Sequence, residues 1–240
     1  MTLGSLFSGI GGIDLGFQRA GFEIAWQVEI DEFCRKVLAK HWPDTRRHDD
    51  VKTFPPTDPS EWKVDVIAGG FPCQDISNAG RREGIGGKRS GLWSEFARIV
   101  REIGPKIVVI ENVPAIFDRG IDRVLCDLAA IGFDAEWGIL PASSVGSPVK
   151  RERFFGVCCR TGTEKVPVFS ESASERSGQL RRFRREKESD TEWDLYWATG
   201  ESRIQRVVDG VPNRVDRLKG LGNAVVPQVA EWIARRIAEL

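Results

Sequence analysis

The 240-residue sequence lacks several features that would assign it directly to a class of protein. No run approaches the roughly 20 apolar residues that a membrane span requires, so the sequence predicts no membrane partner. No basic segment precedes the first apolar stretch, MTLGSLFSG, and the sequence therefore predicts no signal peptide.

Cysteine and histidine are scarce. The five cysteines are an odd number without C-x-x-C spacing, which argues against both a disulfide framework and a cysteine-rich zinc site. Only two histidines, His41 and His48, are available for catalysis or metal binding. We therefore expect no metal site.

An excess of charge of one sign is also lacking, because 35 basic residues balance 35 acidic ones. The distribution is nevertheless uneven: residues 1–150 hold 18 basic and 21 acidic residues, and residues 151–240 hold 17 and 14. The sharpest local excess is a group of four arginines, namely Arg181, Arg182, Arg184 and Arg185. Such a cluster is typical either of a polyanionic partner or of a solvated loop, and charge alone leaves both open.

Apolar stretches of strand length alternate with segments of helical periodicity over the first 160 residues. Strands are predicted at 3–7, 23–28, 64–68 and 107–110, with a later pair at 136–140 and 154–158. The intervening segments are predicted to be helices that end near residues 20, 41, 103 and 131. This alternation is typical of a doubly wound, mostly parallel α/β sheet.

The pattern breaks near residue 160. Residues 161–204 are rich in Ser, Glu and Arg, with Trp193, Tyr196 and Trp197 among them, and contain too few aliphatic residues to form a core. We predict a small irregular insertion in one domain built from residues 1–160 and 205–240. A last helix is expected to dock on the sheet through one apolar face: Val225, Val229, Trp232, Ile233, Ile237 and Leu240.

Two features near the N-terminus favour a nucleoside ligand. A glycine turn, FSGIGG at residues 7–12, follows the first strand, but Asp14 stands where a pyrophosphate fingerprint needs its third glycine. Glu29 ends the second strand, where a carboxylate can accept hydrogen bonds from two ribose hydroxyls. A tight turn between a strand and a helix, with an ordinary surface glutamate nearby, would give the same sequence pattern.

Three further motifs lie at or near the ends of later strands: GFPCQ at 70–74, ENV at 111–113 and KRER at 150–153. Cys73 would be a strong nucleophile as a thiolate, and Glu111 would place a carboxylate in the crevice at the sheet edge. Arg151 and Arg153 share one face of an extended segment. Taken singly, these motifs also fit a small core cysteine, a polar strand end and a charged loop.

In this order, the motifs resemble those of the C5-cytosine DNA methyltransferases. The resemblance rests on FSGIGG, the acid after strand two, GFPCQ, ENV, KRER and a late GNAVVPQ, and covers about 1–160 and 205–240. Val149 replaces the glutamine that usually opens the Q-x-R-x-R element, and the arginine-rich stretch before the last glycine motif is recast as RVVDGVPNRVDRLKGLGNAV. The target-recognition region, 161–204, is short. In these last two respects the sequence resembles small members of the family from phages or prophages.

The resemblance implies a methyltransferase fold that binds S-adenosyl-L-methionine and releases S-adenosyl-L-homocysteine. Glu29 would hold the ribose and Asp50 would meet the adenine amino group. The full set of implied cofactor contacts is Phe7, Ser8, Gly9, Gly11, Gly12, Glu29, Asp50, Pro72, Asn223 and Val225.

The resemblance also implies a catalytic group. Cys73 would attack C6 of a flipped-out cytosine, Glu111 would bond N3 and the exocyclic amine, and Arg153 with Arg151 would contact the base. Double-stranded DNA is the implied partner of a monomer that acts in the cytoplasm of a bacterial or phage-infected cell, at the nucleoid. DNA contacts are expected at Gln74, Ser77, Arg82, Lys88, Arg89, Arg181, Arg182, Arg184 and Arg185.

Three alternatives stay open at this point. One branch of the family methylates cytosine in tRNA, so an RNA substrate is possible. A second alternative is a catalytically idle DNA-binding homologue, which the intact Cys73, Glu111 and Arg153 argue against. A cysteine hydrolase would need a partnering histidine, and neither histidine adjoins a recognisable motif.

Overall fold

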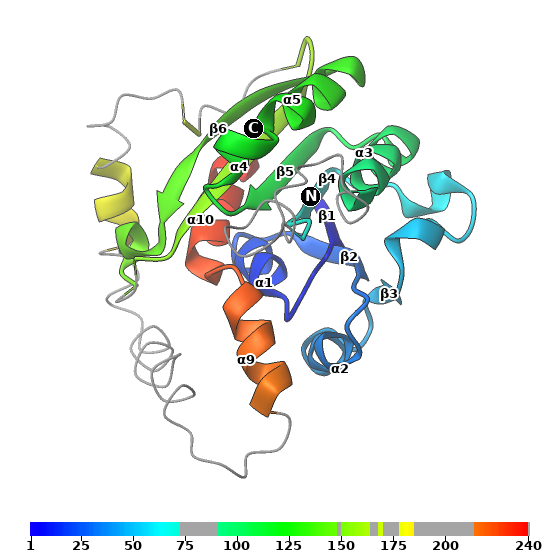
Figure 1. Cartoon of the computed structure of the whole chain (residues 1–240), viewed down its shortest axis with the longest axis horizontal. Helices are drawn as coiled ribbons and strands as arrows, with labels where there is room; N and C mark the ends of the chain where they lie inside the picture. The colour runs from blue at the N-terminus through cyan, green and yellow to red at the C-terminus, as the bar shows by residue number, and fades with distance from the viewer. Residues whose placement is uncertain (73–90, 148–149, 164–167, 170–177, 185–213, 240) are drawn as a thin grey trace.

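A computed structural model describes residues 1–72, 91–147, 150–163, 168–169, 178–184 and 214–239. Within these residues, seven strands form one sheet with helices on both faces (Figure 1). The strands are β1 (Thr2–Leu6), β2 (Glu23–Val28), β3 (Arg46–His48), β4 (Val66–Gly69), β5 (Ile107–Asn112), β6 (Phe133–Pro141) and β7 (Glu152–Arg160).

The strand order is β3-β2-β1-β4-β5-β7-β6. All pairs are parallel except those of β7, which runs antiparallel to both β5 and β6. This confirms the predicted doubly wound, mostly parallel sheet. The order reverses between β1 and β4, and the carboxyl ends of these neighbours border the crevice in which such sheets bind ligands.

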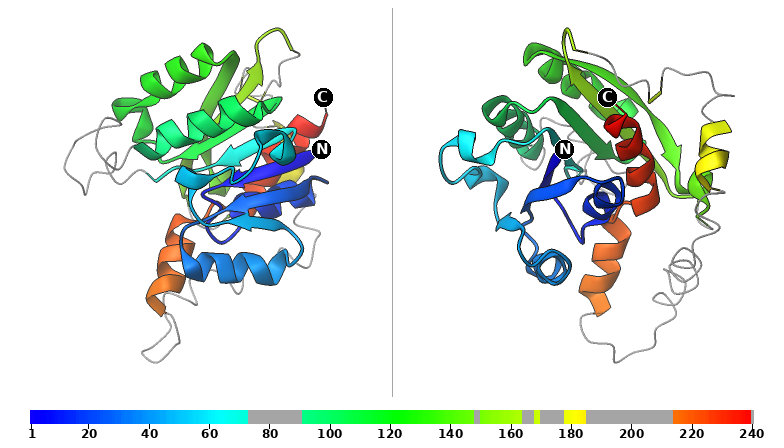
Figure 2. Two further views of the ribbon diagram at one scale, coloured as in Figure 1. Left: turned by 90° about the vertical axis from the view of Figure 1, so that its right-hand side faces the viewer. Right: turned by 180° about the vertical axis from the view of Figure 1, so that it is seen from behind.

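The longer helices form a layer on each face of the sheet, as the two views of Figure 2 show. Their bounds are α1 (Gly12–Arg19), α2 (Glu32–His41), α3 (Gly91–Ile103), α5 (Ile121–Ala130), α9 (Arg214–Asn223) and α10 (Pro227–Ala238). Short turns complete the described elements: α4 (Ile116–Arg119), η1 (Val51–Thr53), η2 (Pro59–Trp62) and η4 (Ala142–Val145). None of the described helices is long and apolar enough to cross a membrane.

Among the residues that the structure describes, the buried apolar side chains form two clusters, one on each face of the sheet. Successive residues of β5 alternate between them, with Val108 in the cluster of α3 and α5 and Val109 in the cluster of α1 and α10. All six residues of β5 are buried, which explains why its apolar run shows no alternation. On the second face, α1 and α10 pack so closely that a Cβ on Gly16 would lie 2.5 Å from Ala230 Cβ.

Several described elements differ from the sequence prediction, and α9 is among those that it did not include. The short edge strand β3 had no apolar signal and was missed. Helix α10 begins at Pro227, after Val225, and its buried residues include the polar Gln228 and Glu231 as well as the predicted face. Glu231 accepts a hydrogen bond from Arg235 at 2.9 Å, which compensates its burial in part. Leu240 lies outside the described residues.

A helix at residues 178–184 lies within the segment predicted to be irregular. Leu180 and Phe183 are buried in the core cluster of α1 and α10, and the Arg235 guanidinium lies 5.2 Å from the Phe183 ring centre. Residues 168–169 are also attached to the sheet, because the Glu136 carboxylate accepts hydrogen bonds from both backbone N–H groups at 3.1 Å. The described parts of this segment therefore pack on the core.

Candidate active site

Two adjoining clefts lie at the carboxyl ends of the parallel strands, with volumes of about 460 and 490 Å³. Phe7, Glu29, Ile30 and Pro72 line both of them. The clefts thus form one continuous site across the switch point between β1 and β4.

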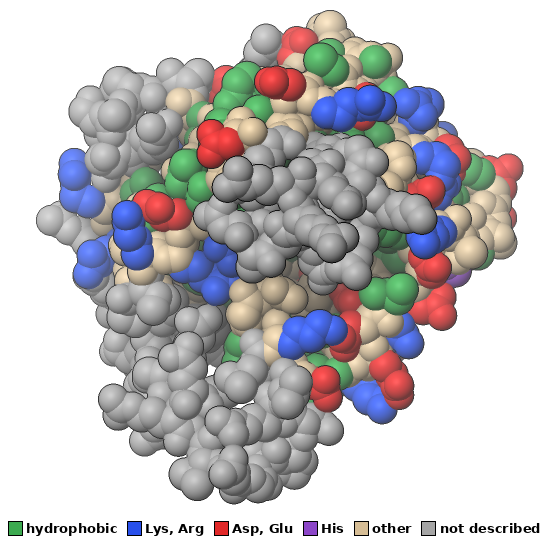
Figure 3. All heavy atoms as spheres, viewed as in Figure 1, with side chains coloured by type: hydrophobic (Ala, Val, Ile, Leu, Met, Phe, Trp, Pro, Cys, Tyr) green, Lys and Arg blue, Asp and Glu red, His purple; other side chains and the backbone are tan. Residues whose placement is uncertain are grey.

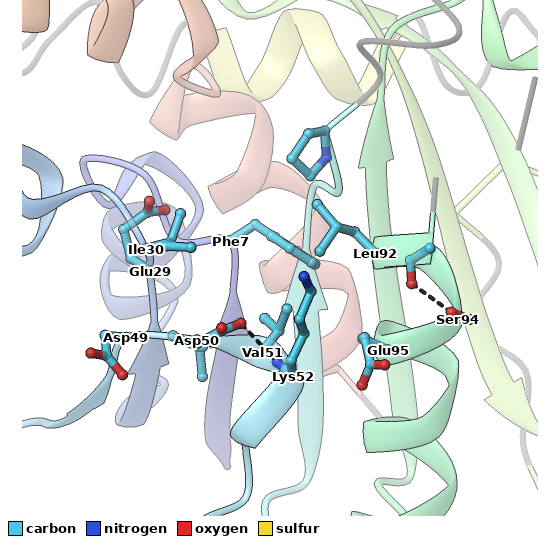
Figure 4. Close-up of a pocket in the computed structure, with 13 residues that line it drawn as sticks. Phe7, Glu29, Ile30, Asp49, Asp50, Val51, Lys52, Leu92, Ser94 and Glu95 are labelled. Atoms are coloured by element: carbon cyan, nitrogen blue, oxygen red, sulfur yellow. Dashed lines mark hydrogen bonds between the residues drawn. The ribbon is translucent and has the colours of Figure 1, made fainter. Parts of the chain in front are cut away.

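The first cleft suits a flat ring. Phe7, Val51 and Leu92 form apolar walls, as Figure 4 shows, and Asp50 supplies a carboxylate at the rim. One carboxylate oxygen of Asp50 accepts the Lys52 N–H at 2.9 Å, which fixes the side chain at the start of η1. An acceptor beside apolar walls is what recognition of a heterocycle with an exocyclic amine needs.

Glu29 lies where the two clefts meet. Its Oε2 accepts the Gly9 N–H at 2.7 Å, and its Oε1 accepts the Asp31 N–H at 2.8 Å. Each oxygen keeps a second lone pair, so the carboxylate is held in place and can still accept two hydroxyl groups. The predicted role of Glu29 is therefore compatible with its geometry.

The glycines of the turn after β1 have different surroundings. Gly9 and Gly12 line the second cleft, and a Cβ on Gly12 would lie 2.3 Å from the Val225 carbonyl oxygen. Gly11, with φ 88°, lies outside the cleft lining, and a Cβ there would meet the Trp42 ring. Gly11 therefore permits the turn and its packing on α2.

Glu111 and Arg153 form an ion pair in the second cleft. Arg153 Nε lies 2.9 Å from Glu111 Oε1, and the two side chains are 18% and 11% exposed. Gly70 leaves room for this carboxylate, because a Cβ at that position would lie 2.3 Å from Glu111 Oε2. Phe71 and Pro72 line the same cleft, and Cys73 is the next residue in the sequence.

Burial raises the pKa of Glu111 to about 7, although the positive charges of Arg153 and Arg151 act in the opposite direction. The desolvation of a carboxylate inside the protein outweighs the attraction of its partners here. Near neutral pH, Glu111 is thus available as an acid as well as an acceptor.

Arg151 lies elsewhere. Its Nη2 donates hydrogen bonds to the carbonyl oxygens of Gly222, in the last turn of α9, at 2.7 Å and of Ala224, just after that helix, at 2.5 Å. Asn223 and Val225, predicted as cofactor contacts, line the same cleft as Ser8. The structure thus brings together the glycine turn, Glu29, Glu111, Arg153 and the C-terminal end of α9 with the residues that follow it.

Several predicted residues lie outside the described part of the chain: Cys73, Gln74, Ser77, Arg82, Lys88, Arg89, Val149 and Arg185. Arg181, Arg182 and Arg184 are described and exposed on the helix at 178–184. The position of Cys73 and the roles of these residues remain predictions.

Sequence reasoning missed a buried acid beneath the glycine turn. Asp14 on α1 accepts hydrogen bonds from Ser5 Oγ at 3.1 Å and Gln27 Nε2 at 2.8 Å. Burial raises its pKa to about 6, and the nearby charge of Glu29 adds to this. The failed glycine fingerprint was the only signal that marked Asp14.

Replacing Asp14 by Asn should alter the pH dependence of stability. An acid with a raised folded pKa stabilises the fold below its unfolded pKa of 3.8 and loses that contribution as the pH rises through about 6. The free energy of unfolding of the parent should fall by about 3 kcal/mol relative to Asp14→Asn over this interval. Urea titrations at pH 4 and 7 measure it, and a pH-independent difference would contradict the assignment.

The comparisons with known proteins agree with this geometry. A family model described as C-5 cytosine-specific DNA methylase matches residues 1–210. The chain belongs to this family.

Individual relatives support the assignment. The Type II methyltransferase M.NgoFVII of Neisseria gonorrhoeae is 34% identical over 163 residues, which are 66% of this chain and 44% of the relative. A solved structure described as a DNA modification methyltransferase encoded within an Escherichia coli prophage is 28% identical, with a TM-score of 0.59, over 70% of this chain and 50% of that one.

A third comparison extends over the whole fold. The Entamoeba histolytica methyltransferase EhMeth is 14% identical, with a TM-score of 0.68, over all of this chain and 98% of that one. At this identity the likeness concerns the fold alone. The chain spans about half the length of the curated relatives that it matches first.

Proposed function

We propose that this protein is a DNA (cytosine-5-)-methyltransferase. The observation that carries the proposal is the ion pair between buried Glu111 and half-buried Arg153, which shares one cleft with Pro72, the residue before Cys73, and with the glycine turn. A protonatable carboxyl group held by a guanidinium matches the N3, amino and O2 edge of cytosine in hydrogen-bonding character.

The donor and acceptor set fits S-adenosyl-L-methionine. The first cleft accommodates adenine between Phe7 and Leu92, and the carboxylate of Glu29 receives the ribose hydroxyls. The close approach of Gly12 to Val225 forms the floor of a cradle that any larger residue would fill. When bound, this cofactor supplies a methyl group activated by a sulfonium.

In the proposed reaction, residues of this chain activate the cytosine ring for methylation at C5. Cys73 attacks C6, the electron pair moves towards N3, and Glu111 gives its proton to N3 so that C5 becomes nucleophilic. Arg153 holds the Glu111 carboxyl group and contacts the base. After methylation at C5, water takes the C5 proton, the C5–H electron pair re-forms the C5=C6 double bond and expels the Cys73 thiolate, and N3 returns its proton to Glu111, which restores the enzyme.

Duplex DNA is the proposed substrate, and the cytoplasm of a bacterial or phage-infected cell is the proposed location. Lys and Arg side chains gather at the left of Figure 3, where Figure 1 places the helix at 178–184 in yellow. Arg181, Arg182 and Arg184 are exposed there, whereas Leu180 and Phe183 attach the helix to the core. We assign these arginines mainly to phosphate contacts, because adjacent cations on one short helix cannot all reach base edges.

A triple Ala variant at Arg181, Arg182 and Arg184 should bind all DNA sequences more weakly. Each phosphate contact that is lost should flatten the plot of log K against log salt by about one unit. Fluorescence anisotropy at several salt concentrations measures this slope, with Arg101→Ala on α3 as a control. Parental affinity and slope in the triple variant would exclude the assignment.

Glu29→Ala should weaken cofactor binding and leave DNA binding unchanged. The loss of two hydrogen bonds to a charged acceptor should cost about 2–3 kcal/mol in total, discounted for partial solvation. Isothermal titration with S-adenosyl-L-homocysteine measures the change. Glu23→Ala, at the exposed start of β2, is the matched control, and equal affinities in the two variants would show that Glu29 has been misassigned.

Transfer of a labelled methyl group tests the proposed function directly. Purified protein should label mixed-sequence duplex DNA and leave tRNA unlabelled in a parallel reaction. Labelling of tRNA alone would support the RNA alternative. The absence of labelling on both would favour an idle DNA-binding homologue.

A further inference from the structure

Residues 222–225, which we call the junction loop, comprise the last two residues of α9 and the first two of its connection to α10, and they form one wall of the second cleft. Asn223, Ala224 and Val225 line that cleft opposite the glycine turn. Val225 is buried in the core cluster of α1 and α10, but Gly222 and Asn223 are exposed and Ala224 is only half-buried. The backbone before Val225 therefore depends on hydrogen bonds from neighbouring elements for its position.

Two ionic side chains hold this region from opposite sides. On one side, Arg151 Nη2 donates to the carbonyl oxygens of Gly222 and Ala224, at 2.7 and 2.5 Å. On the other, Lys219 Nζ lies 2.7 Å from Oδ2 of Asp31, and Asp31 also caps the N-terminus of α2. The two contacts join the end of α9 to the residue that precedes β7 and to the segment that follows Glu29.

The backbone directs Arg151 to the junction loop. Arg151 has a φ of 23°, in the left-handed region that residues with a side chain rarely adopt, and its carbonyl accepts the Ala142 N–H at 3.1 Å. Two residues later, Arg153 is in the regular strand and contacts Glu111. Arg153 lines the cleft, whereas Arg151 is absent from the described lining residues.

We infer that Arg151 is a positioning residue for the cofactor and makes no contact with the target base. By fixing the carbonyls of Gly222 and Ala224, its guanidinium holds Asn223 and Val225 against the glycine turn in the geometry that the cofactor needs. This inference rests on the proposed function. It assigns Arg151 to the cofactor site, whereas its sequence motif would place it beside the cytosine.

Arg151→Met, which removes the charge and both hydrogen bonds, separates the two roles. We expect the Kd for S-adenosyl-L-homocysteine to rise at least tenfold, and kcat at saturating cofactor to stay within threefold of the parent. Arg153→Met should show the opposite split, with a near-parental Kd and a large loss of kcat. Lys150→Met removes an exposed cation one residue earlier and should change neither quantity.

A parental Kd in Arg151→Met, with or without a fall in kcat, would overturn the inference. If that variant does not fold, Arg151→Lys replaces it, because Lys keeps the charge but lacks the planar fork that reaches both carbonyls. This variant should raise the Kd by a smaller factor, and an unchanged Kd would again overturn the inference. A parent protein that does not bind S-adenosyl-L-homocysteine would instead refute the proposed function.

Discussion

Replacing Cys73 by Ser should lower methyl transfer by more than about a thousandfold, the largest effect expected of any single substitution here. A serine hydroxyl is almost entirely protonated at neutral pH and is a far weaker nucleophile than a thiolate. Scintillation counting of labelled DNA measures the loss.

Two controls accompany this substitution. Cys126→Ser, at an exposed position on α5, should retain parental activity. The affinity of Cys73→Ser for S-adenosyl-L-homocysteine should remain parental, because Glu29 and the glycine turn are intact. Substantial methylation by Cys73→Ser would remove Cys73 from the proposed role of nucleophile.

Glu111→Gln should have the second largest effect, a loss of about 10²–10⁴-fold in kcat. The glutamine amide can still donate to N3 and accept from the exocyclic amine, but it has no proton to give to N3 as C6 is attacked. Binding of substrate should therefore persist while turnover fails. Steady-state kinetics with DNA as the varied substrate separates kcat from KM.

The pKa of Glu111 adds a second measurement. Since that pKa is raised to about 7, the protonated fraction falls as the pH increases above 7. The parent should lose kcat on this alkaline side, and the residual rate of Glu111→Gln should not show that loss. An equal loss of kcat in both proteins would argue against Glu111 as the acid.

The sequence was sufficient to predict the sheet and the main parts of the site. Buried strands such as β5 have apolar runs that are readable without a structure, and glycine turns mark where the chain reverses. Because carboxyl ends of parallel strands meet at one edge, Glu29, Glu111 and the glycine turn could be placed together in advance. The position of each of these residues at the end of a predicted strand was enough to group them at this edge.

Contacts between distant segments could not be predicted in this way. The Lys219–Asp31 pair joins residues 188 positions apart, and each residue alone is an ordinary surface charge. The direction of the Arg151 side chain depends on one unusual backbone angle, which strand alternation does not reveal. The helix at 178–184 was missed because its two buried side chains gain their apolar partners only from the folded core.

Covalent trapping tests the central claim most directly. Duplex DNA in which every cytosine carries fluorine at C5 cannot lose a proton there, so the Cys73 adduct should persist after methylation. With S-adenosyl-L-methionine present, the parent should give a shifted band on a denaturing gel, and peptide mapping should place the DNA on Cys73. No shifted band from a preparation that methylates ordinary DNA, or an adduct on another residue, would contradict the account.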